Sequence, residues 1–428
     1  FKGKKGKVKT HGGFILMFPT FRVLVLSRNY PNNLFPALGL WVKRLVHYCS
    51  DICELKVIAP VPYFPPIRGF ESYRRFRHIV RHSREDSVEA FYPRFLVGPG
   101  QSLYISEALS YYMGIRHTAD KLHQGFAFNL IHAHFTYPDG VVAAWLGRRY
   151  GVPVIITEHV QWRPNWVDKL TGHVLWSPTW IDKHRLVLWQ ALWAARKCAS
   201  MIAVSNSVKN TIVHFTGQPG KVRVIPIGMD GSIFTIPQNF SKDKKNQVLY
   251  VGFINFNKGV DILWKAIHRV IKRIPDTKLL MLGGSFYNNT LRQEKQLRSM
   301  AKDLGLDDHI EFVGIKSPIE VAKYMRESAL LVLPSRAESF GAVLVEALAC
   351  GTPVIATRCG GPEDIITDEV GILVQNEDDN ALAHAIELVL TQQKMYDQAK
   401  LRAYALENFS WERVASKTID LYKETIEK

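Results

Sequence analysis

Short, continuous apolar runs alternate with segments of helical length along most of the chain. In the first half these runs occupy residues 22–26, 55–59, 130–133, 154–157, 200–204 and 222–225. In the second half they occupy residues 247–251, 278–282, 310–312, 330–333, 354–356 and 371–374. Continuous rather than alternating apolar runs are typical of parallel strands that are covered by helices on both faces. The pattern therefore predicts a doubly wound α/β fold.

The alternation starts afresh near Gln247, after a polar stretch with the sequence PQNFSKDKKN. Because 428 residues exceed the usual size of a single hydrophobic core, we predict two Rossmann-like domains that face each other across a cleft. Their bounds are residues 21–236 and 247–408, with a linker at residues 237–246. Neither domain has a G-x-G-x-x-G turn, which argues against an ordinary dinucleotide site.

Three segments do not follow this alternation. Residues 1–20 begin with a stretch rich in lysine and glycine, and we expect them to be a disordered lead-in outside the fold. Residues 63–104 are rich in arginine, aromatic residues and proline. We predict a long structureless loop there, of the kind that tends to be functional. Residues 411–426 carry apolar positions at helical spacing, which predicts an amphipathic helix packed on another element.

The composition is that of a soluble globular protein, with 47% hydrophobic and 22% charged residues. No apolar run reaches the roughly 20 residues that a membrane-spanning helix needs. Five cysteines occur at irregular spacing, which predicts no disulfide framework and a reducing, cytoplasmic environment.

The net charge of +16 is concentrated in one half of the chain. Residues 1–235 hold 30 Lys and Arg against 13 Asp and Glu, whereas the remaining residues hold 25 against 26. This asymmetry predicts an anionic partner for the first half. Nucleic acid, a membrane surface and an acidic substrate are the candidates, and plain solvation of a basic face is the alternative.

The strongest chemical signal is the stretch LLVLPSRAESFGAVLVEALACGTPVIAT at residues 330–357. A buried strand would end at Pro334, and a loop holding Glu338 and Gly341 would lead into a helix. Ligands of open α/β sheets bind at this end of the strands, where a helix N-terminus offers free N–H groups to a phosphate. Glu338 is suited to sugar hydroxyls, and Glu346 to the two hydroxyls of a ribose. The alternative is a capping role for Glu338 and a solvated position for Glu346.

This stretch resembles the E-x7-E signature of the retaining glycosyltransferases of family 4 (glycosyltransferase group 1), in particular members that build polysaccharides. Further matches are YVGFINFNKG at residues 250–259, the T-x-H motif that ends at His159, IPIGMD at residues 225–230, GGPEDII at residues 360–366 and FSW at residues 409–411. The resemblance implies the GT-B fold, with two facing Rossmann-like domains. It also implies that the last helix, residues 409–428, crosses back onto the first domain.

The resemblance implies roles for single residues as well. His159, Glu338 and Lys258 would be catalytic: Lys258 would neutralise the donor diphosphate, Glu338 would hold sugar hydroxyls, and His159 would lie beside the transferred sugar. The donor-binding residues would be Gly39, Lys258, Ser339, Phe340, Gly341, Ala342, Val343 and Glu346. For Gly39 a helix N-cap is the alternative interpretation. Family members use the donor phosphate to assist front-face attack, so we expect no cofactor and no essential metal.

The sequence departs from the family pattern at Phe253, where the family has an arginine that helps to bind the diphosphate. Arg336, Arg358 or Lys316 could replace it, and the alternative is a donor that is held with less positive charge. We expect four side chains to line the cleft, namely His134, Asp139, Phe253 and Arg336. The H-x-H pair of His132 and His134 is not interpreted as a metal site, because we assign the two rings to opposite faces of their strand and find no further ligands nearby.

These observations predict an enzyme that moves a hexose or N-acetylhexosamine from a UDP- or GDP-sugar to a glycan or lipid-linked saccharide in cell-surface polysaccharide synthesis. A lipid-linked acceptor would place the basic first domain on the inner face of the cell membrane, and nucleic acid is the least favoured partner. The alternative is a non-catalytic protein of the same fold that binds a nucleotide-sugar or nucleic acid. The joint presence of His159, Lys258, Glu338 and Glu346 favours the enzyme.

Overall fold

The computed structural model describes residues 21–65, 67, 71–98, 106–162, 185–236, 246–284 and 288–428. The predicted lead-in at residues 1–20 and all but the last residue of the predicted linker lie outside these ranges.

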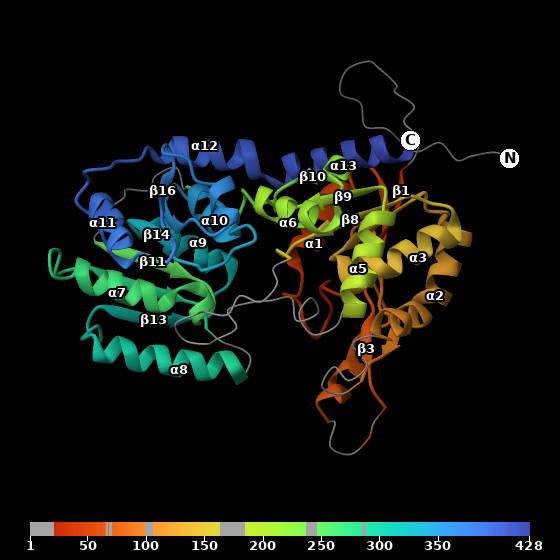
Figure 1. Ribbon diagram of the computed structural model, residues 1–428, viewed down its shortest axis with the longest axis horizontal. Helices are drawn as coiled ribbons and strands as arrows, with labels where there is room; N and C mark the ends of the chain where they lie inside the picture. Colours follow the sequence, from red (N-terminus) through yellow and green to blue (C-terminus); the bar gives the residue numbers. More distant parts are fainter. Residues whose placement is uncertain are drawn as a thin grey trace.

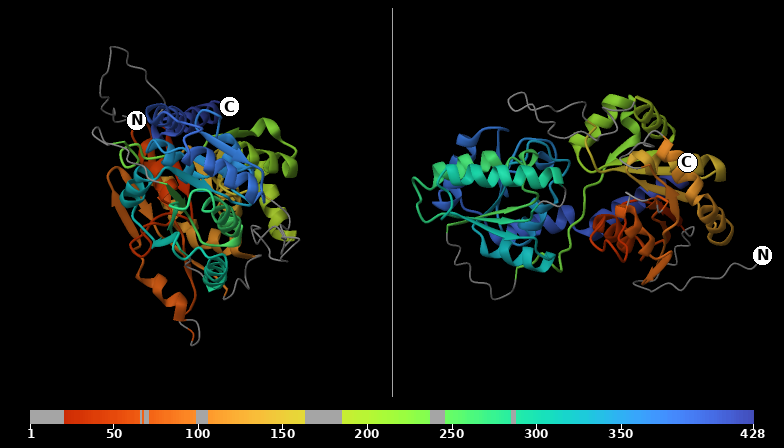
Figure 2. Two further views of the ribbon diagram at one scale, coloured as in Figure 1. Left: turned by 90° about the vertical axis from the view of Figure 1, so that its left-hand side faces the viewer. Right: turned by 90° about the horizontal axis from the view of Figure 1, so that it is seen from below.

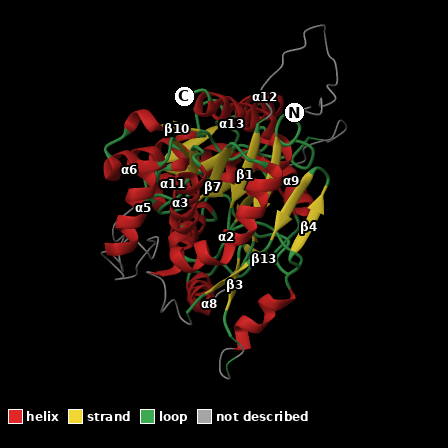
Figure 3. Cartoon of the chain, turned by 90° about the vertical axis from the view of Figure 1, so that its right-hand side faces the viewer, coloured by secondary structure: helices red, strands yellow, loops and turns green. Residues whose placement is uncertain are grey.

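The first lobe is built on an eight-stranded sheet with the order β10-β9-β8-β7-β1-β2-β5-β4. All neighbouring strands are parallel except β4 and β5. The strands are β1 (Arg22–Leu26), β2 (Glu54–Ile58), β4 (His82–Glu85), β5 (Val88–Phe91), β7 (Leu130–His134), β8 (Val154–Glu158), β9 (Ser200–Ala203) and β10 (Val222–Val224). Figure 3 shows these strands running between helices on either side.

Both faces of the central strands of this sheet are buried, whereas the edge strand β4 is largely exposed. Leu24 and Leu26 of β1 contact the layer of α2, α3, α5 and α6, whereas Val23 and Val25 contact α1 and the C-terminal helix. The helices are α1 (Leu40–Cys49), α2 (Glu107–Phe126), α3 (Val141–Tyr150), α5 (Arg185–Lys197) and α6 (Asn206–Thr216). A strand that is buried on both faces is apolar at every position, which explains the continuous runs in the sequence.

The second lobe repeats this plan with six strands in the order β13-β12-β11-β14-β15-β16, all parallel to their neighbours. The strands are β11 (Gln247–Val251), β12 (Lys278–Leu282), β13 (Ile310–Gly314), β14 (Leu330–Leu333), β15 (Val354–Thr357) and β16 (Gly371–Val374). The helices α7 (Val260–Val270), α8 (Asn288–Asp303) and α11 (Asp379–Leu390) cover one face. The helices α9 (Pro318–Glu327), α10 (Ala342–Ala349) and α12 (Gln398–Phe409) cover the other. Figure 2 shows the two lobes side by side.

All twelve predicted strands are present, within one or two residues of the expected ends. The prediction for residues 63–104 was wrong, because the described part of this segment contains regular structure. It holds the 3-10 helix η1 (Glu71–His78), strands β4 and β5, and β6 (Arg94–Leu96), which pairs with β3 (Val61–Tyr63). These strands are short, and β5 alternates between buried and half-buried positions, so a search for continuous apolar runs passed over them.

The C-terminal helix α13 (Trp411–Ile426) crosses from the second lobe to the first (Figure 1). Ser410 caps it by accepting a hydrogen bond from Arg413 N, and the helix packs on α1. Trp411 lies against Gly228, where an added Cβ would come within 2.3 Å of the indole ring. The backbone of Met229 pairs with that of Ser410 at this crossing. The helix therefore fixes one lobe against the other, as the resemblance implied.

The contact between Gly228 and Trp411 yields a stability prediction. In the Gly228→Ala variant the new methyl group must displace the indole, so we expect a loss of about 1–3 kcal/mol of stability and a lower midpoint of thermal unfolding. Gly125→Ala is the matched control: this exposed helical glycine has nothing within 4 Å of an added Cβ, and alanine should stabilise α2 by up to about 1 kcal/mol. Equal midpoints for the two variants would contradict the packing described here.

Candidate active site

The residues predicted to act together follow the carboxyl ends of strands in both lobes. In the first lobe, Gly39 follows β1 and His159 follows β8; in the second, Lys258 follows β11 and Glu338 follows β14. Because parallel strands all end at the same edge of a sheet, each set is brought to one edge, where ligands of open α/β sheets bind.

Lys258 and Glu338 form an ion pair, with 2.5 Å between Nζ and Oε2. Asn255 shapes the lysine loop by accepting a hydrogen bond from Lys258 N (2.9 Å). Gly259 has a φ of 64°, and a Cβ on it would lie 1.8 Å from the carbonyl oxygen of Pro334. Only glycine therefore lets the lysine loop lie so close to the end of β14. The sequence predicted both residues for the site, and the structure places them in contact.

The loop that carries Glu338 leads directly into α10. Gly341 is the N-cap of this helix, with a φ of 99° and no side-chain hydrogen bond to the first turn. Ala342 and Val343 form that first turn, and Ser339 and Phe340 precede the cap. The helix start thus presents backbone N–H groups that no side chain caps, which is the arrangement that favours an anion.

Glu346 lies further along α10, among the buried residues Leu344, Val345, Ala347 and Leu348. Within the described part of the chain its carboxyl group has no hydrogen bond or ion pair. Part of the side-chain surface is exposed, but burial of the carboxyl group raises its pKa to about 8. A carboxyl group held near its neutral form without a partner is suited to accept hydrogen bonds from a ligand once it ionises.

His159 belongs to a cluster of three histidines towards the carboxyl ends of β7 and β8. Its Nε2 lies 3.0 Å from Nδ1 of His134, while His132 bonds to the hydroxyl groups of Tyr422 (2.6 Å) and Thr157 (2.7 Å). Burial lowers the pKa of His159 and of His132 to about 3, so the rings are neutral.

The assignment of His132 and His134 to opposite faces of their strand was wrong. Their ring centroids are 4.5 Å apart, because residues two apart on a strand share a face. No group of three or more His, Cys, Asp or Glu side chains that could hold a metal ion occurs in the described ranges.

Two carboxylates near the site differ from expectation. Asp139 does not line the cleft: it is 1% exposed and accepts hydrogen bonds from Tyr111 Oη and Arg28 N, both at 2.8 Å. It therefore holds the loop after β1 in place from the protein interior.

Glu158 was not identified from the sequence as a residue of this region. It accepts hydrogen bonds from the N–H groups of Thr136, His159 and Val160 and from the indole of Trp162. An acid at the end of a buried strand, directly before His159, was the available signal.

Gly39 is the N-cap of α1, with a φ of 62°. A Cβ there would lie 1.9 Å from the carbonyl oxygen of Asn29. The loop after β1 therefore needs glycine at this position for its own geometry, in agreement with the alternative interpretation.

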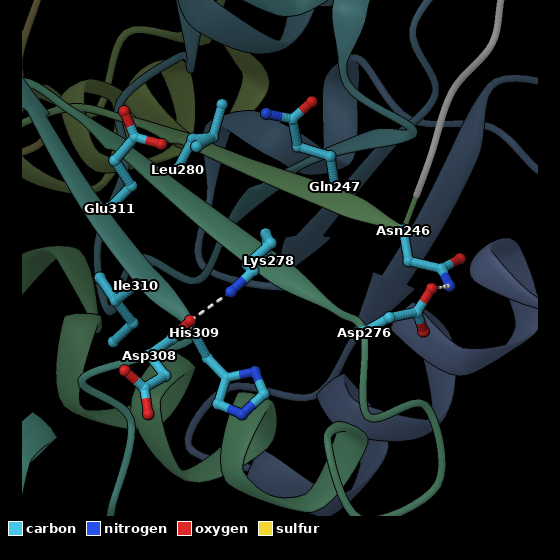
Figure 4. Close-up of a pocket in the computed structure, with 9 residues that line it drawn as sticks. All are labelled: Asn246, Gln247, Asp276, Lys278, Leu280, Asp308, His309, Ile310 and Glu311. Atoms are coloured by element: carbon cyan, nitrogen blue, oxygen red, sulfur yellow. Dashed lines mark hydrogen bonds between the residues drawn. The ribbon is translucent and has the colours of Figure 1, made fainter.

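A wide hollow elsewhere in the second lobe does not coincide with these residues (Figure 4). It is lined by Asn246, Gln247, Asp276, Lys278, Leu280, Asp308, His309, Ile310 and Glu311. Except for Leu280 in the middle of β12, these residues lie at or just before the amino-terminal ends of β11, β12 and β13, at the opposite edge of the sheet from Lys258 and Glu338. The described helices include none that is long and apolar enough to cross a membrane.

Comparison with known proteins identifies the family. Glycosyltransferase Family 4 matches residues 74–232, and Glycosyl transferases group 1 matches residues 233–406. A D-inositol 3-phosphate glycosyltransferase of Paenarthrobacter aurescens is 30% identical over 321 residues, which cover 70% of this chain and 73% of the relative. The chain belongs to glycosyltransferase family 4.

Solved structures show the same GT-B fold. Sucrose-phosphate synthase from Thermosynechococcus elongatus has a TM-score of 0.73 and 22% identity, covering 94% of this chain and 98% of its own. Anabaena HepE in complex with UDP has a TM-score of 0.67 and 18% identity, covering 95% of this chain and 100% of its own. At these identities the likeness establishes the fold alone.

Arg336 does not take the place of the arginine that the family resemblance led us to expect at Phe253. Arg336 is 4% exposed, and its guanidinium bonds to both oxygens of Asp261 (2.7 and 2.8 Å) and of Glu377 (2.6 and 3.0 Å). It thus joins the loop after β14 to the first turn of α7 and to the loop after β16. Phe253 is 41% exposed, and Arg358 is exposed after β15.

Proposed function

We propose that this glycosyltransferase moves a hexose or N-acetylhexosamine from a UDP- or GDP-sugar to a glycan or lipid-linked saccharide, with retention of configuration and without an essential metal. The observation that carries the proposal is the Lys258–Glu338 ion pair at the uncapped start of α10. It puts a cation and free N–H groups, which suit a diphosphate, beside a carboxylate that suits sugar hydroxyls. HepE, a protein of the same fold, is described in complex with UDP.

In this arrangement the donor would lie mainly on the second lobe. The diphosphate would form an ion pair with Lys258 in place of Glu338, and it would accept hydrogen bonds from the backbone N–H groups in the first turn of α10. The Glu338 carboxylate would then be available to bind the sugar hydroxyls. Glu346 would hold the ribose. His159 would approach the transferred sugar from the first lobe, with its backbone carbonyl near the anomeric carbon. The donor phosphate would assist deprotonation of the acceptor, so the mechanism requires no separate base.

The decisive experiment is a screen for UDP or GDP release with a panel of donor sugars and saccharide acceptors. With the donor that is used, Glu338→Ala should lower turnover on the order of 100-fold, because a group that stabilises the reacting sugar is lost. Glu407→Ala, an exposed change on α12, should leave turnover unchanged. Nucleotide-sugar binding without turnover by the wild-type protein would instead support the non-catalytic alternative.

The pH dependence of nucleotide binding tests Glu346. Burial raises its pKa to about 8, so below that pH the carboxyl must lose a proton before both oxygens can accept hydrogen bonds from the ribose. Affinity for UDP or GDP should therefore fall as the pH drops from 9 towards 6, approaching about tenfold per unit. Calorimetric titration should show this slope in the wild type but not in Glu346→Gln. The same slope in both proteins would rule out the role of Glu346.

We also propose that the basic first lobe contacts an anionic membrane surface on the cytoplasmic side. In η1 the exposed side chains Arg74, Arg75 and Arg77 have no carboxylate partner within the described residues. Arg75 packs over the rings of Phe35 and Phe76, which anchors η1 to the loop after β1. In Figure 1, β3, on which η1 packs, lies on the side of the molecule opposite α12 and α13.

Vesicle binding tests the membrane contact. Replacing Arg74, Arg75 and Arg77 with alanine should weaken binding to phosphatidylserine vesicles by roughly 3 kcal/mol, since each cation contributes about 1 kcal/mol. The control removes the same charge from exposed lysines of the second lobe, with alanine at Lys265, Lys272 and Lys302. If both triple variants lost the same affinity in a sedimentation assay, the contact would be non-specific and the proposal wrong.

A further inference from the structure

Gln161 joins the loop of His159 to the loop of Glu338 across the two lobes. This side chain, 2% exposed, follows His159 by two residues. Its Nε2 donates to Ser207 Oγ in its own lobe (2.7 Å) and to the main-chain oxygen of Glu338 in the other (3.1 Å). Its backbone N–H donates to Ser339 Oγ (3.3 Å). Since a carbonyl oxygen can only accept, the amide nitrogen must face Glu338, and both of its hydrogens are used.

The second lobe is shaped to admit this amide. Gly360 has a φ of 127°, and a Cβ on it would lie 2.1 Å from Gln161 Nε2 and 2.8 Å from the oxygen of Glu338. The same oxygen accepts a hydrogen bond from Gly361 N at 2.7 Å. Glu338 is thus held at its carbonyl by Gly361 and Gln161, and at its carboxylate by Lys258 and by Ser335 Oγ (3.3 Å). Of these four residues that bond to Glu338, Gln161 is the one that belongs to the first lobe.

A second bridge lies beside the first. Asp364, at the end of η7 (Gly361–Asp364), accepts from the backbone N–H of Asn206 and from its side-chain amide, the latter at 3.1 Å. Asn206 is the first residue of α6, and the N-cap Ser205 of this helix accepts a hydrogen bond from Val208 N. The two bridges flank Ser207, which is itself bonded to Gln161. They hold the edge of the first lobe that carries His159 against the loops of the second lobe that carry Glu338 and Gly360.

We infer that Gln161 is a positioning residue for transfer: it sets the Glu338 loop against the His159 loop when the lobes close, without touching donor or acceptor. This inference rests on the proposed function, because Glu338 and His159 are the groups it positions. Donor binding rests mainly on the second lobe and does not require the bridge. Correct closure of the two lobes does require the Gln161 bridge. Misplaced reacting groups and the entry of water both lower the rate of transfer more than they lower the affinity for the donor.

Gln161→Glu is the sharp test, because it keeps the shape and replaces the donating amide with an oxygen that opposes the Glu338 carbonyl. We expect transfer kcat to fall about tenfold or more, equivalent to about 1.4 kcal/mol. The Kd for UDP or GDP should change less than about threefold, and the fraction of donor lost to hydrolysis should rise. Gln218→Glu is the matched control: Gln218 is half-buried in the same lobe and has no bond across the cleft in the described ranges.

A second measurement needs no turnover and so separates this inference from the proposed function. In an Asp364→Ala background, which removes the other bridge, Gln161→Glu should increase the radius of gyration seen by small-angle X-ray scattering, whereas Gln218→Glu should not. An unchanged radius, or a loss of kcat/KM matched by an equal loss of nucleotide affinity, overturns the positioning role. If the wild type turns over no donor at all, the proposed function fails, while the scattering result still decides whether Gln161 holds the lobes together.

Discussion

The organisation of the site depends on one constraint: within each lobe the parallel strands end at the same edge of the sheet. This constraint brings together residues that are far apart in the chain, such as Lys258 and Glu338, whose charged groups meet at 2.5 Å. It also fixes where polar groups are tolerated in the central strands, because these strands are buried on both faces and their ends are the first positions at which a carboxylate or an ammonium group can reach solvent or a ligand.

The two edges form one site only because further contacts hold the lobes against each other. The helix α13 packs on the first lobe through Trp411 and Tyr422, and Tyr422 bonds to His132, two residues before His134. The Gln161 and Asn206 contacts act at the cleft itself. The C-terminal helix is therefore part of the support of the histidine cluster, and the cluster of three neutral rings supports His159. The last residues of the chain thus shape a loop that lies more than two hundred and fifty residues earlier.

The sequence supplied the candidate site residues, but not their environments. The family motifs assigned Lys258 and Glu338 separate roles, and the structure brings the two side chains into an ion pair. Arg336 was expected to line the cleft and was one of three candidates to replace the missing arginine, yet Asp261 and Glu377 enclose its guanidinium. Asp139 was expected in the cleft, and Tyr111 instead holds it in the interior. In both cases the partner lies on another element, 75 and 28 residues away in the chain, and no local pattern encodes such a contact.

The sequence by itself determined the α/β class, the positions of twelve parallel strands along the chain, and the family, because burial on both faces imposes continuous apolar runs and because ligand-binding loops keep short local motifs. It also showed that the charge is concentrated in the first half. Only the tertiary structure decided that residues 63–98 add β5 and β4 to the sheet, that His132 and His134 share a face with His159, and that Glu158 and Gln161 hold the loop between them. Those features depend on hydrogen bonds between separate strands and lobes, whose geometry exists only once the chain has folded.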